Sequence, residues 1–284
     1  MEGSTRTVYG GYIQTCLALG LPPSYPTGTT MNEELGINAT TLPASDDTPK
    51  LAYWVIGNKG HDFVKGTNGI AKPETLQHKT TDSGLFGQIP FVLRPVGNDL
   101  SPVDRTKYAL RREETWGSQV YAAYYARRID LTNVTPQMQY NAVANGTTTT
   151  TQFVPTSSNL HPTPPALNNA GVNTVTGDYL TADALLNLTL TTDDATELQN
   201  VASIMFGDAA AAVISEIGMC FGVDHIVSVT STGAGNFNMN EVIGTTIAMH
   251  IPALYPMTFA DEGVTITLNL GSSDPLFALT NTGS

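Results

Sequence analysis

Acid–base chemistry is the first possibility that the sequence offers, in a glycine-rich stretch of the N-terminal half. Residues 57–62 read Gly-Asn-Lys-Gly-His-Asp, so His61 could act as a general base oriented by Asp62 or Asp82. A histidine within a glycine turn more often caps the turn or hydrogen-bonds the backbone. We favour this structural interpretation over the enzymatic one.

The other candidate groups are weaker. Asp224 and His225 could form an acid–base pair or half of a metal site, but a metal site needs three or four ligands, and no other histidine has ligand spacing with this pair. Glu113 and Glu114 are adjacent, so on a strand they point to opposite faces and cannot form a facing carboxylate pair. The glycines at 233–235 match neither a dinucleotide fingerprint nor a P-loop. We therefore predict no catalytic residue, no metal, no cofactor and no small-molecule substrate.

Arginine side chains offer a second kind of chemistry, the binding of carboxylates. Four of the seven arginines lie in two pairs within residues 107–129, which we interpret as a β-hairpin with its turn at 116–118. A helix over 107–114 is the main alternative. In the hairpin both pairs lie near the same end, so we expect them to donate to carboxylates, first of all those of a neighbouring subunit. The four residues are Arg111, Arg112, Arg127 and Arg128.

Charge is divided unevenly along the chain, because no lysine or arginine follows Arg128. Residues 1–128 hold 13 basic and 12 acidic residues, a net of +1, whereas residues 129–284 hold 13 acidic residues and a net of −13. The total of −12 argues against binding nucleic acid through its phosphates and against an anionic membrane surface. Segregated charge suits head-to-tail rings, in which unlike faces of two subunits meet.

A tract without any formal charge, 131–177, separates the aromatic, arginine-bearing part from the acidic part. It contains five consecutive threonines at 147–151 and recurrent apolar residues, which a disordered linker seldom has. We expect an extended arm, part β and part polyproline-like, that lies against another surface. Whether it is ordered only on assembly stays open. The predicted apolar subunit contacts, from this arm and the C-terminal tail, are Phe153, Leu160, Leu276, Phe277 and Leu279.

One main helix is expected, over about 194–221. Asp194, with Glu197 three residues later, resembles a capping box, and apolar residues follow at helical spacing. Gly207 and Asp208 could divide it into two helices. The runs that predict strands are 51–57, 89–95, 183–190, 226–230, 241–252 and 263–271.

The remaining elements are short or undecided. Residues 8–19 fit a strand or a short helix, and Ser101 followed by Pro102 predicts a helix start. We interpret 20–50 as a long surface loop and 57–88 as mostly loop, since prolines and glycines interrupt them.

Together these elements predict an α+β fold with a mixed, largely antiparallel sheet, one main helix and a long extended arm or loop. The predicted parts are 1–130, β-rich; 131–177, the arm; and 178–284, an acidic α+β part that could form one domain with the first. Cys16 and Cys220 are predicted to be free buried thiols, although the sequence does not exclude their pairing. The first residues lack a basic stretch followed by an apolar one, so we expect synthesis in a cytoplasm.

Three segments carry a resemblance to a known class of protein. They are LAYWVIGNKGHDF at 51–63, GQIPFVLRPVGNDLSPVDRTKYALRR at 87–112 and VYAAYYARRIDL at 120–131. In these the chain resembles virion structural proteins of tailed bacteriophages, mainly over 50–131 and more loosely over 178–225. The uncharged arm departs from that pattern.

The resemblance implies a non-enzymatic component of a bacteriophage tail, neck or baseplate, made in the host cytoplasm and built into the virion. Such a protein works as an oligomeric ring, with itself and other virion proteins as partners. The resemblance carries over no active-site residue. A receptor-binding or carbohydrate-binding adhesion module of a virion is the alternative, and a hydrolase that uses His61 or His225 is a third reading.

Overall fold

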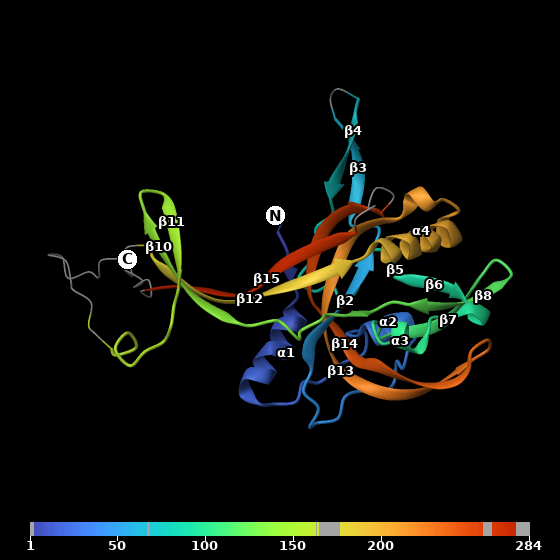
Figure 1. Cartoon of the computed structure of the whole chain (residues 1–284), viewed down its shortest axis with the longest axis horizontal. Coiled ribbons are helices and arrows are strands. Elements are labelled where there is room, and N and C mark those ends of the chain that lie inside the picture. Colours follow the sequence, from blue (N-terminus) through green and yellow to red (C-terminus); the bar gives the residue numbers. More distant parts are fainter. Residues whose placement is uncertain (1–2, 67–68, 163, 165–176, 258–262, 277–284) are drawn as a thin grey trace. The chain divides into compact units, whose positions relative to one another are not determined.

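The computed structural model describes residues 3–66, 69–162, 164, 177–257 and 263–276, in two compact units (Figure 1). Unit 1 comprises Met1–Ile129 and Thr189–Val264, and unit 2 comprises Asp130–Leu188 and Thr265–Ser284. The acidic part expected at 178–284 is therefore shared between the units, while the expected arm belongs to unit 2. Most of the structure is antiparallel β-sheet with few helices, broadly an α+β fold. The predicted fold class is confirmed at this level.

A six-stranded antiparallel sheet forms the centre of unit 1. Its strand order is β1-β14-β13-β2-β5, with β9 pairing β2 as well. Two of these strands are long and pair with each other along most of their length, and β13 also pairs with β2. The bounds are β1 Thr5–Arg6, β2 Lys50–Gly57, β5 Gln88–Ile89, β9 Arg127–Arg128, β13 Val213–Ser231 and β14 Gly235–Pro256.

The predicted main helix is only half right. Helix α4 spans Thr192–Phe206 and ends at Gly207, whose φ of 77° is left-handed. Its N-cap is Thr191, with Asp194 in the third position of the capping box, so the cap lies three residues earlier than expected. A 3-10 turn at Ala209–Ala211 then leads into β13.

The residues expected to continue this helix form the buried first half of β13. From Ile214 to Gly222 every residue is buried, because β2 and β14 flank the strand and both of its faces are covered. A continuous apolar run of this kind has no period that separates strand from helix. Gly222, just after the expected end of the helix, allows close packing within the sheet, since a Cβ there would lie 2.3 Å from Val242.

A three-stranded sheet, ordered β6-β8-β7, is the second sheet of unit 1. The predicted hairpin is confirmed around its turn, as β7 (Arg111–Trp116) and β8 (Gln119–Tyr124), which turn at Gly117 with a φ of 62°. Only Arg111 and Arg112 lie on it, because Arg127 and Arg128 form β9 and pair with β2 of the six-stranded sheet. Strand β6 (Val92–Pro95) and β5 divide the single strand expected over 89–95. Helix α3 (Pro102–Arg105) begins as predicted, with the hydroxyl of Ser101 accepting from the Asp104 amide.

Two segments expected to be loop contain regular structure. Helix α2 (Met31–Leu35) lies within 20–50 and has a complete capping box at Thr30 and Glu33. Its five residues are too few for a period, so burial decides its structure. In 57–88 the strands β3 (His61–Lys65) and β4 (Ala71–Thr75) form a hairpin. Residues 8–19, which fitted a strand or a helix, form the helix α1 (Val8–Leu19).

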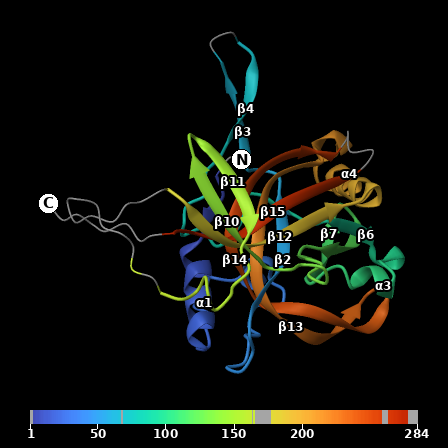
Figure 2. The same cartoon turned by 60° about the vertical axis from the view of Figure 1, so that its left-hand side comes forward.

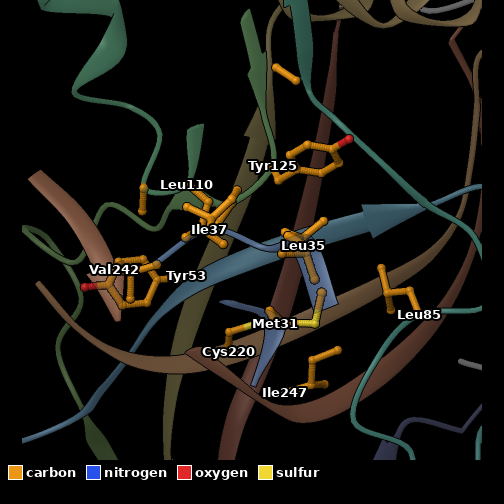
Figure 3. Packing of buried hydrophobic residues seen from close by; sticks show 14 of the residues in the cluster. Met31, Leu35, Ile37, Tyr53, Leu85, Leu110, Tyr125, Cys220, Val242 and Ile247 are labelled. Atoms are coloured by element: carbon orange, nitrogen blue, oxygen red, sulfur yellow. The ribbon is translucent and has the colours of Figure 1, made fainter. Parts of the chain in front are cut away.

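The core of unit 1 joins the sheet to these short elements (Figure 3). Met31 and Leu35 of α2 are buried in the same cluster as Tyr53 of β2 and Cys220 of β13. Cys16 and Cys220 are both buried and free, as predicted. Burial raises the pKa of the Cys220 thiol, which keeps the group protonated and unreactive.

Unit 2 contains a four-stranded sheet ordered β11-β10-β12-β15. Its strands are β10 Gln137–Ala144, β11 Thr147–Gln152, β12 Tyr179–Leu190 and β15 Val264–Pro275, of which β12 and β15 begin or end in unit 1. Asn145 and Gly146, both at positive φ, form the turn between β10 and β11, an arrangement typical of a two-residue hairpin. The β part of the predicted arm is therefore confirmed as a hairpin within a sheet.

Among the helices of the described residues, none has the length and apolar character needed to cross a membrane.

Gly60 is the tightest glycine at the base of the β3–β4 hairpin, because a Cβ there would lie 2.3 Å from the Ser215 carbonyl oxygen. We expect Gly60→Ala to lower the free energy of unfolding by about 2 kcal/mol, since backbone must shift. Urea unfolding would measure this. Gly97→Ala is the matched control, because nothing lies within 4 Å of its Cβ position. Equal effects of the two substitutions would contradict this account.

Candidate functional site

The four arginines predicted at a subunit interface are all paired within their own chain. Arg111, only 2% of whose side chain is exposed, donates from NH2 to Asp99 Oδ2 at 2.9 Å and lies 3.4 Å from Glu113 Oε1. The Asp99 carboxylate also accepts from the Tyr124 hydroxyl at 2.7 Å. This pair belongs to the interior of unit 1.

The other three arginines follow the same pattern. The pairs are Arg112 with Glu114 at 2.7 Å, Arg127 with Asp194 at 2.8 Å, and Arg128 with Asp224. All four arginines therefore have a carboxylate partner within the chain, which is distant in sequence for Arg127 and Arg128 and local for Arg111 and Arg112. Their contact with a neighbouring subunit stays a prediction. Asp194 and Asp224 come from the acidic half, which the sequence alone left equally open to a neighbouring chain.

The two histidine–aspartate pairs are not brought together. His61 Nε2 lies 3.1 Å from the Thr75 hydroxyl across the β3–β4 ladder, and Asp62 instead accepts from the Phe63 amide. Asp224 accepts from the Tyr53 hydroxyl at 2.7 Å, while His225 is exposed.

The adjacent glutamates of β7 also diverge, as expected. Glu113 accepts from the hydroxyl of Thr232 at 2.9 Å, and Glu114 accepts from Arg112 and Trp116.

A different cluster of titratable groups is buried in unit 1. His78 and Asp82 come from the loop before β5, Glu216 from β13 and His250 from β14. His78 Nε2 lies 2.9 Å from Glu216 Oε2, and His78 Nδ1 lies 3.1 Å from Asp82 Oδ2. The imidazole is thus held between two carboxylates, a composition typical of acid–base sites.

Aromatic rings close this cluster on both sides. The His78 ring stacks between Phe86 and His250, with centroid separations of 3.8 Å on each side and nearly parallel planes. The Glu216 carboxylate also accepts from the backbone amides of Phe86 and Gly87, at 3.0 and 2.8 Å. The loop that carries these residues is therefore fixed to the central strand through one carboxylate.

The surroundings shift the titration of these groups. Burial opposes ionisation of Glu216, but the hydrogen bonds from His78 and the two amides outweigh it, so the pKa of Glu216 is lowered. Burial also opposes ionisation of Asp82, yet the Lys79 amide and His78 lower its pKa. Burial, followed by the nearby His78, lowers the pKa of His250 to about 4.

Access decides what this cluster can do. Side-chain exposure is 6% for His78 and 2% for Glu216, and the cavity beside them measures about 10 Å³, too small for a substrate. We interpret the cluster as a structural lock for the loop 78–87. Sequence reasoning missed it because Glu216 is 138 residues away from His78 and no local spacing marks the pair.

Metal binding has no donor set in the described part of the chain, where no group of three or more histidine, cysteine, aspartate or glutamate residues is placed to hold an ion.

The predicted apolar contacts are only partly described. Phe153 is half-buried, Leu160 is exposed and Leu276 is exposed, whereas Phe277 and Leu279 lie outside the described residues. A surface that the sequence did not single out is the β3–β4 hairpin, where Phe63 and Ile70 are 70% and 66% exposed. In the sequence this surface was marked only by an apolar Phe-Val pair within a glycine-rich stretch.

Residues 1–284 match the model of a family of unknown function, DUF7208. The chain belongs to this family. No curated protein and no solved structure shows significant similarity to it.

Removing a buried guanidinium should lower the free energy of unfolding more than removing an exposed one. We expect Arg111→Gln to lower the free energy of unfolding by about 3 kcal/mol, because Asp99 then lacks its closest cation in the interior. Arg128→Gln should cost less than about 1 kcal/mol, since half of the Asp224 side chain is exposed. Chemical denaturation of both variants would test this, and similar losses would show that the Arg111 pair is not structural.

The histidine stack should make stability fall in mild acid. Because the pKa of His250 drops from 6.5 to about 4 on folding, the unfolded chain binds a proton below pH 6.5 that the folded chain does not, so stability falls with pH in this window. The free energy of unfolding should decrease between pH of about 7 and about 5, and we expect His250→Phe to make this decrease smaller by about 2 kcal/mol. Urea unfolding at both pH values measures it. His225→Phe, at an exposed site, is the control and should leave the loss unchanged.

Proposed function

We propose that this protein is a non-enzymatic structural component of a bacteriophage virion that works by assembling with further copies of itself and with other virion proteins. The observation that carries the proposal is the β3–β4 hairpin. Its two strands pair only with each other among the described residues, and it extends away from the six-stranded sheet of unit 1 (Figures 1 and 2).

The hairpin has two unlike faces. Phe63 is paired with Pro73 at the centre of one face, which also holds the polar pair of His61 and Thr75 at its base and Lys65 next to the turn. The neighbouring pair, Val64 with Lys72, points to the opposite face, where Lys72 forms an ion pair with Glu74. The hairpin thus has one face with an exposed apolar centre and one charged face, a pattern that suits packing on the apolar centre.

Nothing in the described part of unit 1 covers the apolar side. A two-stranded hairpin is marginally stable by itself in water and needs a third strand or a packed layer. Exposed apolar residues that are contiguous and raised above the surface mark sites of protein association. A partner protein is therefore the simplest source of the missing layer.

Other features support assembly over catalysis. The acid–base cluster at His78 is closed, and the two histidine–aspartate pairs are separated. The resemblance of 50–131 to virion structural proteins of tailed phages supports the finer part of the proposal, an oligomeric ring in the tail, neck or baseplate.

A second candidate, an adhesion module that binds a receptor or a carbohydrate, is favoured by one feature of unit 2. A cavity of about 350 Å³ there is lined largely by uncharged polar residues, among them Asn187 and Asn269, together with Asp183. Amide and carboxylate groups in a hollow of this size can hydrogen-bond sugar hydroxyls.

Light scattering coupled to size-exclusion chromatography tests the first proposal. We expect the wild-type protein to form a closed oligomer, and Phe63→Asp to shift it to smaller species, because a carboxylate would be buried in the contact. Val64→Asp, on the charged face of the same hairpin, is the matched control and should still assemble.

A wild-type protein that stays monomeric at every concentration tested would contradict assembly. If that monomer binds glycans and Asn187→Ala abolishes the binding, the adhesion candidate is supported in its place.

A further inference from the structure

One arginine of unit 1 lacks the hydrogen-bonded partner that every other arginine has. Six of the seven donate a side-chain hydrogen bond to a residue of their own chain, and they are Arg6, Arg94, Arg111, Arg112, Arg127 and Arg128. Arg105, at the end of α3, lies 3.5 Å from Asp99 without a hydrogen bond, and its Nε is buried with no partner within the described residues. Arg111 Nε and Arg127 Nη1 are buried without a hydrogen-bond partner as well, but those two side chains donate through another nitrogen.

Asp99 is shared among several donors and lies too far from Arg105 to form a hydrogen bond with it. Oδ2 accepts from Arg111 at 2.9 Å, and Oδ1 accepts from the Tyr124 hydroxyl and the Leu100 amide, each at 2.7 Å. Only 13% of the Arg105 side chain is exposed. A guanidinium held so far from water normally has its donors filled, since an unmade hydrogen bond of a buried group is costly.

The guanidinium lines a cavity of about 220 Å³. Its carbon lies 3.9 Å above the centre of the Phe237 ring, a cation–π contact that fixes the plane of the group and leaves its edge free to donate. Pro102 and Met239 add apolar walls. Arg128 lines the same cavity, but it donates to Asp224 and to the Asn240 carbonyl. Arg105 is therefore the donor that remains for a ligand.

We propose that this cavity binds a carboxylate presented by unit 2 of a second copy of the chain. The Nη groups of Arg105 make no hydrogen bond among the described residues and can donate to a carboxylate, and charge-assisted bonds of this kind are strong. The proposal rests on the assembly proposed above and names one contact of it.

Charge complementarity indicates why the ligand comes from unit 2. This unit has four acidic residues and no lysine or arginine, so its carboxylates have no lysine or arginine partner within the unit. Asp178 and Asp183 accept hydrogen bonds from their own sheet, from Tyr140 and Asn269. Asp130 and Asp274 accept from the Thr132 amide and the Ser272 hydroxyl, but both are exposed and are therefore the carboxylates best placed to meet a neighbour.

The first arm of the test changes the cavity and measures the subunit concentration at half-assembly. We expect Arg105→Gln to raise it by about tenfold to a hundredfold, the loss of a charge-assisted pair. Asn238→Asp, which leaves Arg105 in place and puts a carboxylate of the same chain at the cavity, should weaken assembly similarly. Asn236→Asp is the matched control, because it adds the same charge to the same strand outside the cavity, and should assemble as wild type.

The second arm reverses the charges. Arg105→Asp should disrupt assembly, and adding Asp130→Arg or Asp274→Arg should restore it for the residue that enters the cavity. Wild-type assembly in both Arg105→Gln and Asn238→Asp would overturn this contact while leaving the proposed function intact, as would a loss that neither reversal restores. A wild-type protein that never assembles overturns both. Circular dichroism on each variant separates loss of folding from loss of contact.

Discussion

Burial of a single carboxylate on the central strand is the constraint on which much of unit 1 depends. Glu216 lies in β13 between β2 and β14, where an unpaired charge would cost several kcal/mol. It is compensated by His78 and by two backbone amides, which fixes the loop 78–87 against the sheet. The packing around Glu216 is also tight, because a Cβ on Gly57 would lie 2.4 Å from the Glu216 carboxylate.

The same principle organises the arginines. The second half of the sequence has acids but no lysine or arginine, yet two of its acids, Asp194 and Asp224, meet Arg127 and Arg128 of the first half within one unit. Folding therefore neutralises the imbalance locally. The exception is Arg105, which lies 3.5 Å from Asp99 without a hydrogen bond and is the contact that we propose for assembly. An interface built on one unfilled donor and one apolar hairpin face offers specificity from the former and contact area from the latter.

Local signals in the sequence were reliable where a turn or a cap residue acts alone. Ser101 with Pro102 located the start of α3, and Trp116-Gly117 located the turn of the β7–β8 hairpin. The extent of α4 was misjudged because Ile214–Phe221 is buried on every side and shows no strand period, and only pairing with two neighbouring strands shows that it is β. Helix α2 was missed for the opposite reason, since five residues are too few to show a helical period.

The sequence by itself determined that the chain is acidic, has no catalytic motif and contains an uncharged tract rich in threonine. It also predicted two buried thiols and a hairpin with paired arginines. Only the tertiary structure decided which charges meet. Glu216 and His78 are 138 residues apart. Arg111, on β7 of the other sheet of unit 1, pairs with Asp99. Side-chain types and local spacing constrain what a residue can bind, but long-range strand pairing sets which partners come within a hydrogen-bond distance. For that reason Arg105, which no sequence pattern marked, became the candidate for contact with a second copy, while the four conspicuous arginines did not.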